Sequence, residues 1–296
     1  MEIRTLRYFL AIAKEESITK AAEILHITQP TLSRQIAQME EETGAKLFDR
    51  GARKIKLTSE GILLKRRAEE ILQLVSKAKE ELAIKETRVE GKISIGCGET
   101  SSVLFLSDLL ASFKKKYPYV TFDLFTATAD LVKEQMDKGL LNIGLLLEPI
   151  DMEKYDFIRF NIKENWVVLM PPDDPLSKKD FITAQDLSEL PLIMPRRTNI
   201  QNELANWFGK YYESLNIVFT SNLSTNAAIM VNKRLAYSLV IEGAVPFLDQ
   251  NKVTYRPLNP PLTATSVLAW KRNTPFDLAT KKLIEHLQCF LSIAAS

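Results

Sequence analysis

The spacing of apolar residues changes near residue 90 of this 296-residue chain. Before that point they recur at helical intervals, first in Leu6, Phe9 and Leu10 and again in the run KAAEIL, which ends at Leu25. Beyond it, short apolar or alternating segments such as KISIG, VTFDLF, NIGLLL and SVLAWK are separated by helical stretches or loops. The pattern predicts an all-α N-terminal part followed by an α/β region rich in parallel strands.

The first fifty-eight residues are expected to form short helices and a small hairpin. Thr19 is the expected N-cap of the second helix and Thr28 that of the third, which carries Pro30 in its first turn, where a missing N–H does no harm. The third helix should end near Gly44. The segment RGARKIKLT then alternates basic and apolar residues around a glycine, which predicts a hairpin.

A long helix is expected from Thr58 or Ser59 to about Arg88, with Glu60 in its first turn. Its apolar residues alternate in steps of four and three, the spacing of a coiled-coil seam: Leu64, Ala68, Ile71, Val75, Ala78 and Leu82. We favour a helix that pairs with a second copy of the chain. A helix that lies on its own domain is the alternative, because fewer than four heptads are present.

The α/β region is long for one doubly wound sheet, so the chain is expected to cross between two subdomains. Two strands in succession within DFIRFNIKENWVVLM interrupt the alternation of strands and helices, as a crossing would. A return crossing is expected near NPPLTATSVLAW.

Composition excludes several classes of protein. No run of about 18 apolar residues could span a bilayer, and the start MEIRTLRYFL lacks the pattern of a secretory signal, so we expect a cytoplasmic protein without a membrane partner. Cys97, Cys289, His26 and His286 are too few and too scattered for a disulfide framework or a zinc site, and no metal or cofactor is expected. A net charge of +2 neither requires nor excludes nucleic acid.

Two short helices joined by the tight connection HIT, the second beginning in small polar residues, predict a helix-turn-helix whose second helix enters the major groove of DNA. Gln29 can pair with adenine, while Thr31 and Ser33 can bond to a base or touch a thymine methyl group. Arg34 can reach a guanine or a phosphate. Thr28 and Ser33 also fit plain capping or solvated positions, and the polar face alone does not decide.

The hairpin that follows is strongly basic, and its charges could lie along the DNA backbone or reach the minor groove, as a wing does. These residues are Arg50, Arg53, Lys54 and Lys56. The wing follows the helix pair at the distance that a winged module requires, and this conjunction favours DNA binding over a solvated helix pair.

The runs AAEILHITQPTLSRQI, GAKLFDR and LTSEG together resemble the winged helix-turn-helix of LysR-type transcriptional regulators, and the remaining chain fits that family in length and order. The resemblance implies a winged helix-turn-helix DNA-binding domain (1–58), a long dimerising linker helix (59–88) and an effector-binding domain (89–296). The last would consist of two α/β Rossmann-like subdomains of periplasmic-binding-protein type. Their expected boundaries are 91–161 with 265–296 for subdomain I, and 162–264 for subdomain II.

The resemblance also implies partners and DNA-binding residues. The expected partners are double-stranded DNA, a small-molecule effector and further copies of the chain in a homodimer or homotetramer, with RNA polymerase as another candidate. In the family, residues at the positions of Gln29, Pro30, Thr31, Ser33 and Arg34 face the groove, and those at Arg50, Arg53 and Lys54 form the wing. With Ser17 and Thr28 added, these are the expected DNA-binding residues.

An effector site is expected where strands of the α/β region end. In GCGETSSVLFL, Thr100, Ser101 and Ser102 offer hydroxyls beside free N–H groups at a helix start, which suit an anion, although plain N-capping is the alternative. The segment IMPRRTN places Arg196 and Arg197 after a strand, where an arginine could clamp a carboxylate unless both are solvated. The expected effector residues are Thr100, Ser101, Ser102, Thr126, Thr128, Arg196 and Asn226, with Ser224 and Thr225 beside the last.

Three positions leave the detail of this cleft open. Asn142 stands where many members of the family carry Asp, and Lys233, Arg234 and Ala236 stand where they often carry glycines. Cys97 lies near the expected site, but the two cysteines lack the spacing of the family's peroxide sensors.

Two other classes of protein were weighed against a regulator. An enzyme would be expected to show a nucleophile elbow, a phosphate loop or a metal cluster, and the sequence contains neither G-x-S-x-G nor G-x-x-x-x-G-K-[ST]. A solute-binding module, or an enzyme built on the α/β half, would leave the N-terminal helices serving only dimerisation. We therefore expect a sequence-specific DNA-binding transcriptional regulator, not an enzyme, modulated by an anionic effector, most simply a carboxylate metabolite.

Overall fold

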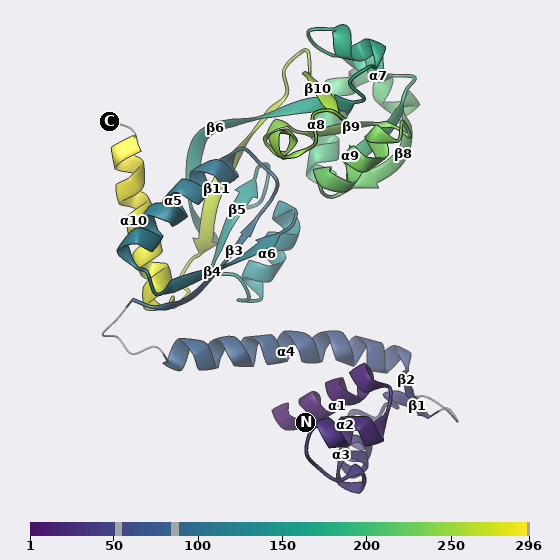
Figure 1. Cartoon of the computed structure of the whole chain (residues 1–296), viewed down its shortest axis with the longest axis vertical. Helices are drawn as coiled ribbons and strands as arrows, with labels where there is room; N and C mark the ends of the chain where they lie inside the picture. Colours follow the sequence, from purple (N-terminus) through teal and green to yellow (C-terminus); the bar gives the residue numbers. More distant parts are fainter. Residues whose placement is uncertain (51–54, 84–88, 295–296) are drawn as a thin grey trace. The chain divides into compact units, whose positions relative to one another are not determined.

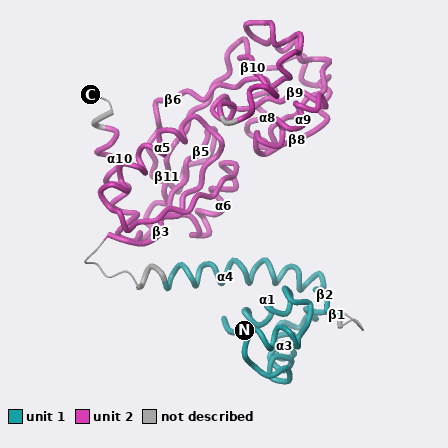
Figure 2. Tube along the Cα trace, in the orientation of Figure 1, with its two compact units in different colours: residues 1–83 teal, residues 84–296 magenta. Residues whose placement is uncertain are grey.

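The computed structural model describes residues 1–50, 55–83 and 89–294. It divides into two compact units, residues 1–83 and 84–296 (Figure 2). Each unit has its own hydrophobic core. Within the described ranges, no helix is both long and apolar enough to cross a membrane.

The first unit is helical with one small antiparallel ribbon (Figure 1). Its elements are α1 (Ile3–Glu15), α2 (Ile18–Ile24), α3 (Gln29–Thr43), β1 (Phe48–Arg50), β2 (Ile55–Leu57) and α4 (Ser59–Ala83). The expected hairpin is present, and its turn lies outside the described residues.

Side-chain hydroxyls set the starts of three helices. Ser17 Oγ accepts a hydrogen bond from Lys20 N at 3.3 Å, so Ser17 caps α2 and the prediction of Thr19 was wrong. Thr28 caps α3 as predicted, since its Oγ1 accepts from Thr31 N at 3.4 Å. Thr58 Oγ1 accepts from Gly61 N at 2.9 Å and fixes the start of α4. Each cap satisfies an N–H group that the helix itself leaves unpaired.

The core of the first unit draws on all of its helices. Leu6, Phe9 and Ile12 of α1 pack with Leu32, Ile36 and Met39 of α3, with Phe48 of β1 and with Leu47, which precedes β1. The long helix α4 adds Ala68, which is fully buried, and the half-buried Leu64 and Ile71. The first half of the predicted coiled-coil seam therefore lies against its own domain, which was the alternative left open by the sequence.

The second half of that seam has a different environment. Val75 is half-buried and Ala78 is exposed, while the side chain of Leu82 lies outside the described residues. The exposed Leu74 is adjacent to Val75. Pairing of α4 with another copy thus stays a prediction that rests on this C-terminal half.

The second unit alternates strands and helices. Its elements are β3 (Gly91–Cys97), α5 (Ser102–Lys116), β4 (Val120–Thr126), α6 (Ala129–Asp137), β5 (Ile143–Leu147), β6 (Tyr155–Met170), η1 (Pro175–Lys178), α7 (Ala184–Leu187), β7 (Pro191–Pro195), α8 (Thr198–Phe208), η2 (Gly209–Ser214), β8 (Asn216–Ser221), α9 (Ser224–Asn232), β9 (Tyr237–Ile241), η3 (Glu242–Phe247), β10 (Thr254–Pro257), β11 (Thr263–Lys271) and α10 (Leu278–Ala294).

In the described part of this unit, nine strands form a mixed sheet in the order β4-β3-β5-β11-β6-β9-β7-β8, with β10 paired to β6. The outer strands are parallel to their neighbours, as β3 is to β4 and β7 is to β8. The central β6 and β11 run antiparallel to each other over most of β11. This confirms the predicted α/β class with a helical N-terminal part.

The two predicted subdomains follow from this sheet (Figure 1). In subdomain I, α5 and α10 pack over one hydrophobic cluster and α6 over another. In subdomain II, α8 and α9 likewise belong to separate clusters. Helices on both sides of a sheet are typical of a doubly wound fold, whose ligands bind where strands end at a switch in topology.

The crossing between subdomains differs from the expected pair of strands. The stretch 155–170 is one continuous strand, β6, which pairs with β11 through Asn165 and with β9 from Trp166 onward. Its polar Glu164 is tolerated because hydrogen bonds satisfy the buried carboxylate, so no break in the strand is needed.

Candidate DNA-binding surface and effector cleft

The front of α3 is exposed and lacks charge until its second turn. Gln29, Pro30 and Thr31 are exposed, Ser33 is half-buried and Arg34 is exposed, whereas Leu32 and Ile36 point into the core. The first helix of the pair, α2, contacts α3. This is the arrangement of a helix-turn-helix, in which the front of the second helix is free to meet base edges.

Two of the predicted DNA-binding residues also cap helices. Ser17 and Thr28 are N-caps, and Thr28 Oγ1 also lies 2.8 Å from Thr31 Oγ1. A capping hydroxyl holds the helix start in place, so these residues orient the α2 and α3 termini whether or not they touch DNA.

The predicted wing is only partly described. Arg53 and Lys54 lie outside the described residues, and of Arg50 only the backbone, in β1, is described. Lys56 on β2 is exposed. The ribbon is tied to α3 by Glu40, whose Oε1 accepts from Leu47 N at 2.7 Å and from Phe48 N at 3.2 Å.

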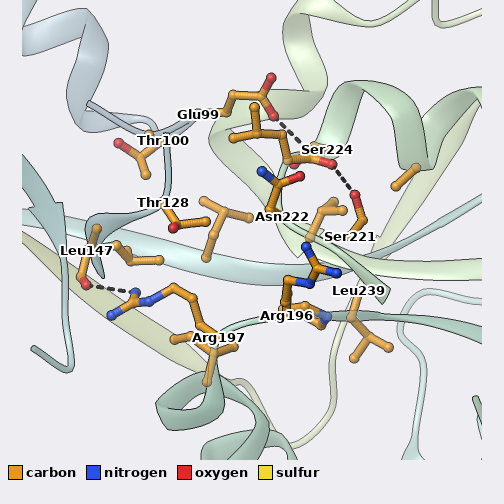
Figure 3. Close-up of a pocket in the computed structure, with 18 of the residues that line it drawn as sticks. Glu99, Thr100, Thr128, Leu147, Arg196, Arg197, Ser221, Asn222, Ser224 and Leu239 are labelled. Atoms are coloured by element: carbon orange, nitrogen blue, oxygen red, sulfur yellow. Dashed lines mark hydrogen bonds between the residues drawn. The ribbon is translucent and has the colours of Figure 1, made fainter. Parts of the chain in front are cut away.

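In the second unit, a cleft lies between the subdomains (Figure 3), with about 720 Å³ of empty space when the open solvent at its mouth is included. Subdomain I contributes the turn Gly98–Thr100, the segment Ala127–Ala129 and the end of β5. Subdomain II contributes the end of β7 with the two arginines, the segment Ser221–Ser224 and β9. Apolar side chains form much of the wall, among them Leu145, Leu147, Trp166, Ile193 and Met194.

The helix start that was expected to bind an anion is already occupied. Glu164 of β6 is fully buried and accepts hydrogen bonds from Ser101 N at 2.8 Å and from Ser102 N at 2.9 Å. Ser102 Oγ donates to the same carboxylate at 2.6 Å. Ser101 and Ser102 therefore have no free N–H group for a ligand, which corrects the expectation for these two residues. Thr100 alone of the three lines the cleft.

The two arginines of the cleft differ in burial and in hydrogen bonding. Arg197 is buried, donates to both carboxylate oxygens of Asp130 at 2.9 and 3.2 Å, and donates to the carbonyls of Leu147 and Pro149 at 3.0 and 2.9 Å. The side chain of Arg196 is exposed and has no hydrogen-bond or ionic partner among the described residues. Figure 3 shows Arg197 turned toward Leu147, and Arg196 toward Ser221 and Asn222.

Of the other predicted effector residues, some line the cleft and some do not. Thr128 lines the cleft, but Thr126 and Asn226 do not and are exposed elsewhere. Asn222 and Ser221 line it instead, four to five residues before Asn226. The polar run SNLSTNAA predicted that residues near the start of α9 would reach the cleft. Which residues of this run line the cleft depends on where α9 begins, and it begins at Ser224.

Sequence reasoning missed Glu99. This residue of subdomain I reaches across to the start of α9, where Ser224 N donates to its Oε2 at 2.6 Å and Thr225 Oγ1 to its Oε1 at 2.6 Å. Glu99 belongs to the turn that was singled out for its hydroxyls, but its partners lie more than a hundred residues along the chain. No local pattern reports such a contact.

Two polar atoms at the cleft are buried and have no hydrogen-bond partner within residues 1–50, 55–83 and 89–294: Thr100 Oγ1 and Trp166 Nε1. Their residues are 7% and 4% exposed, and both line the cleft. A buried polar atom gains from a hydrogen-bond partner, so these two atoms can bind a polar group that enters the cleft.

Of the positions that depart from the family pattern, Asn142 has a clear local role. Asn142 Oδ1 accepts from Ser94 N at 3.0 Å, and Asn142 N donates to Ser94 O at 2.8 Å, which ties the start of β5 to β3. Arg234 has a φ of 58°, in the left-handed region that favours glycine.

Burial raises the pKa of the Cys97 thiol, which keeps the thiol protonated and poorly reactive near neutral pH.

A helix-turn-helix with an exposed polar front, and a separate two-subdomain unit with a lined cleft, define a DNA-binding regulator with a ligand-binding domain. Family comparisons agree over most of the chain. The model of the LysR substrate binding domain matches residues 86–292, and that of the bacterial regulatory helix-turn-helix protein, lysR family, matches residues 3–62.

Relatives and solved structures support the same assignment. The chain is 31% identical to the uncharacterized regulator YybE of Bacillus subtilis, over 86% of each chain, and 30% identical to HcaR, the hca operon activator of Escherichia coli, over 92% of each. Full-length CbnR in complex with its target DNA shares the fold at 22% identity, with a TM-score of 0.74 over 97% of this chain and 99% of that one. Full-length BenM is 26% identical, with a TM-score of 0.54 over 100% and 98%.

The chain belongs to the LysR family of DNA-binding transcriptional regulators. Its relatives are named as regulators, so the α/β half is a substrate-binding domain of a regulator and not an enzyme.

Proposed function

We propose that this regulator reads DNA with the front of α3 and responds to a small anionic metabolite held between its two subdomains. The effector part of this proposal rests on the difference in side-chain bonding between Arg196 and Arg197. Arg197 is bonded to four oxygen atoms of the protein, whereas Arg196 has no side-chain partner among the described residues. A guanidinium at the wall of a cleft with no protein partner is suited to bind a carboxylate.

The DNA half rests on the composition of the exposed front of α3. Gln29 can form two hydrogen bonds to adenine, and Arg34 can do the same with guanine. Thr31 offers a hydroxyl and a methyl group, although the hydroxyl is shared with Thr28. The described lysine of the ribbon, Lys56, would contribute phosphate contacts that do not depend on sequence.

The effector would act through the relative arrangement of the subdomains. β6 and β11 are the strands that continue from one subdomain to the other, and the cleft walls lie on both sides of them. A ligand that contacts both walls binds the closed arrangement more tightly, and it shifts the population toward that arrangement by this difference in affinity.

Self-association has support at both edges of the large sheet. Edge strand β4 exposes Leu124 and Phe125, and edge strand β8 exposes Ile217, Val218 and Phe219. Exposed apolar side chains on unpaired edge strands are a liability in a monomer. We infer that copies of the chain cover these edges in a homo-oligomer.

Isothermal titration calorimetry of the full chain against a panel of organic acids tests the effector half. We expect a carboxylate to bind, and Arg196→Ala to weaken it by about tenfold or more, because one charge-assisted contact is lost. Arg272→Ala is the matched control: Arg272 lies outside the cleft, paired with Asp156, and its loss should leave binding unchanged. Heat from neutral metabolites only, or equal loss in both variants, would contradict an anionic effector.

A further inference from the structure

Of the helices that begin at the cleft, α5 and α9 already have at their N-terminus a carboxylate that comes from elsewhere in the chain. The carboxylate of Glu164 accepts hydrogen bonds from the N–H groups at the start of α5, deep in subdomain I. Glu99 takes the start of α9, across the cleft in subdomain II. The positive ends of these helix dipoles are therefore neutralised before any ligand arrives.

The two internal carboxylates differ in accessibility. Glu164 is fully buried and does not line the cleft, so no ligand can replace it without unfolding of its surroundings. Glu99 lines the cleft, and its partner Thr225 is exposed. Glu99 thus places a negative charge on the wall of the ligand site, whereas Glu164 does not.

The contact made by Glu99 is part of a close junction between the subdomains. Next to it in sequence, the backbone of Thr100 and Ser101 meets Gly243 of η3 so closely that a Cβ on Gly243 would lie 1.9 Å from Ser101 N. This packing holds the backbone of the turn that carries Glu99, and a ligand group that sought the start of α9 would have to displace the Glu99 carboxylate from Ser224 and Thr225.

The rest of the lining offers a single uncommitted cation and a mostly apolar wall. Arg196 is that cation among the described residues, since Arg197 is fully bonded. Trp166 Nε1, an obligate donor, and Thr100 Oγ1 are buried without partners in the part of the chain that the structure describes. These atoms suit a ligand whose body carries a neutral acceptor, such as a carbonyl, hydroxyl or ether oxygen.

We propose that Glu99 is a specificity-determining residue that restricts the cleft to ligands with one anionic group. The single anionic group binds Arg196, the apolar body lies along the wall, and a second anionic group is excluded because Glu99 occupies the start of α9. This proposal rests on the proposed effector function and specifies its ligand class. Like charges placed side by side without a counter-ion disfavour binding, which is how a site rejects an unwanted ligand.

Calorimetry of the full chain with matched mono- and dicarboxylates tests the proposal. The probes are butanoate, hexanoate and octanoate against succinate, adipate and suberate, with phenylacetate against 1,4-phenylenediacetate. Each is titrated into the wild-type protein, into Glu99→Gln, which keeps an acceptor but removes the charge, and into Glu242→Gln. Glu242 is a matched control, since it is hydrogen-bonded to Asn165 and Tyr255 and does not line the cleft.

The wild-type protein should bind at least one monocarboxylate more tightly than its dicarboxylate partner. Glu99→Gln should improve the affinity for the dicarboxylate by about tenfold or more and change that for the monocarboxylate by less than about threefold, because only the dianion gains from loss of the like charge. Glu242→Gln should preserve the wild-type preference.

The outcomes separate this proposal from the function on which it rests. A monocarboxylate that binds through Arg196, with an unchanged preference in Glu99→Gln, overturns the role of Glu99 and leaves the anionic effector intact. Tighter binding of dicarboxylates by the wild-type protein also overturns it. Absence of binding by every probe contradicts the anionic effector itself, and the proposal falls with it.

Discussion

At the scale of single residues, several side chains have roles that their chemistry allowed but did not specify. The hydroxyls of residues 100–102 predicted an anion site. Ser102 Oγ instead donates a hydrogen bond to Glu164, and of the three residues Thr100 alone lines the cleft. Both arginines of IMPRRTN were candidates, and a carboxylate from subdomain I, Asp130, selects one of them for a structural role. The residue types were predictable from sequence, whereas the choice between neighbours depended on tertiary partners.

Arg234 gives a prediction at this scale. Its backbone lies in the left-handed region, which costs a non-glycine residue about 1 kcal/mol. Arg234→Gly should therefore be more stable than Arg234→Ala by about that amount, because both variants lose the ion pair to Asp173 and only glycine relieves the backbone. The measurement is urea unfolding of the full chain followed by tryptophan fluorescence, since Trp166, Trp207 and Trp270 all lie in the second unit. Equal stability of the two variants would contradict the prediction.

At the scale of elements, helical periodicity predicted α4 but not what each part of it contacts. The spacing of Leu64, Ala68 and Ile71 fits a coiled coil and a domain core equally well, because both place apolar residues at three- and four-residue steps. The structure assigns these three to the core of their own unit. Similarly, two strands in succession were expected within DFIRFNIKENWVVLM, and the hydrogen bonds to the buried Glu164 show how a single strand continues through this stretch.

The attachment of α4 gives a prediction at the element scale. A Cβ on Gly61 would lie 2.1 Å from the carbonyl oxygen of Leu47, so the first turn of α4 can approach the ribbon only with glycine there. Gly61→Ala should destabilise the first unit by about 1–3 kcal/mol, although alanine favours helices, because a backbone atom must shift.

Hydrogen exchange of amides in the first unit of the full chain measures this loss separately from the second unit. Gln73→Ala, at an exposed position of the same helix, is the control and should change the unfolding free energy by less than about 0.5 kcal/mol. Exchange rates in Gly61→Ala that match those of the control would show that the close approach is not required.

At the scale of the whole molecule, the account joins two kinds of recognition in one chain. The first unit presents a polar helix front suited to base edges. The second presents a cleft in which the guanidinium of Arg196 has no partner among the residues that the structure describes. The class, the order of domains and the helix-turn-helix could be predicted from sequence, because they depend on local periodicity and on a long motif. The cleft could be predicted only in outline, because Glu99, Asp130 and Glu164 act on partners far away in the sequence.

The most direct test of the central claim is the affinity of Gln29→Ala for specific and scrambled DNA, measured from about 50 to 200 mM salt. The specific site is taken from sequencing of DNA bound by the purified protein. Gln38→Ala, at an exposed position late in the same helix, is the control. We expect Gln29→Ala to lose about 1–3 kcal/mol of discrimination with an unchanged salt slope, because a base contact and not a phosphate contact is removed. Unchanged discrimination, or equal weakening on both DNAs, would contradict the claim that the front of α3 reads sequence.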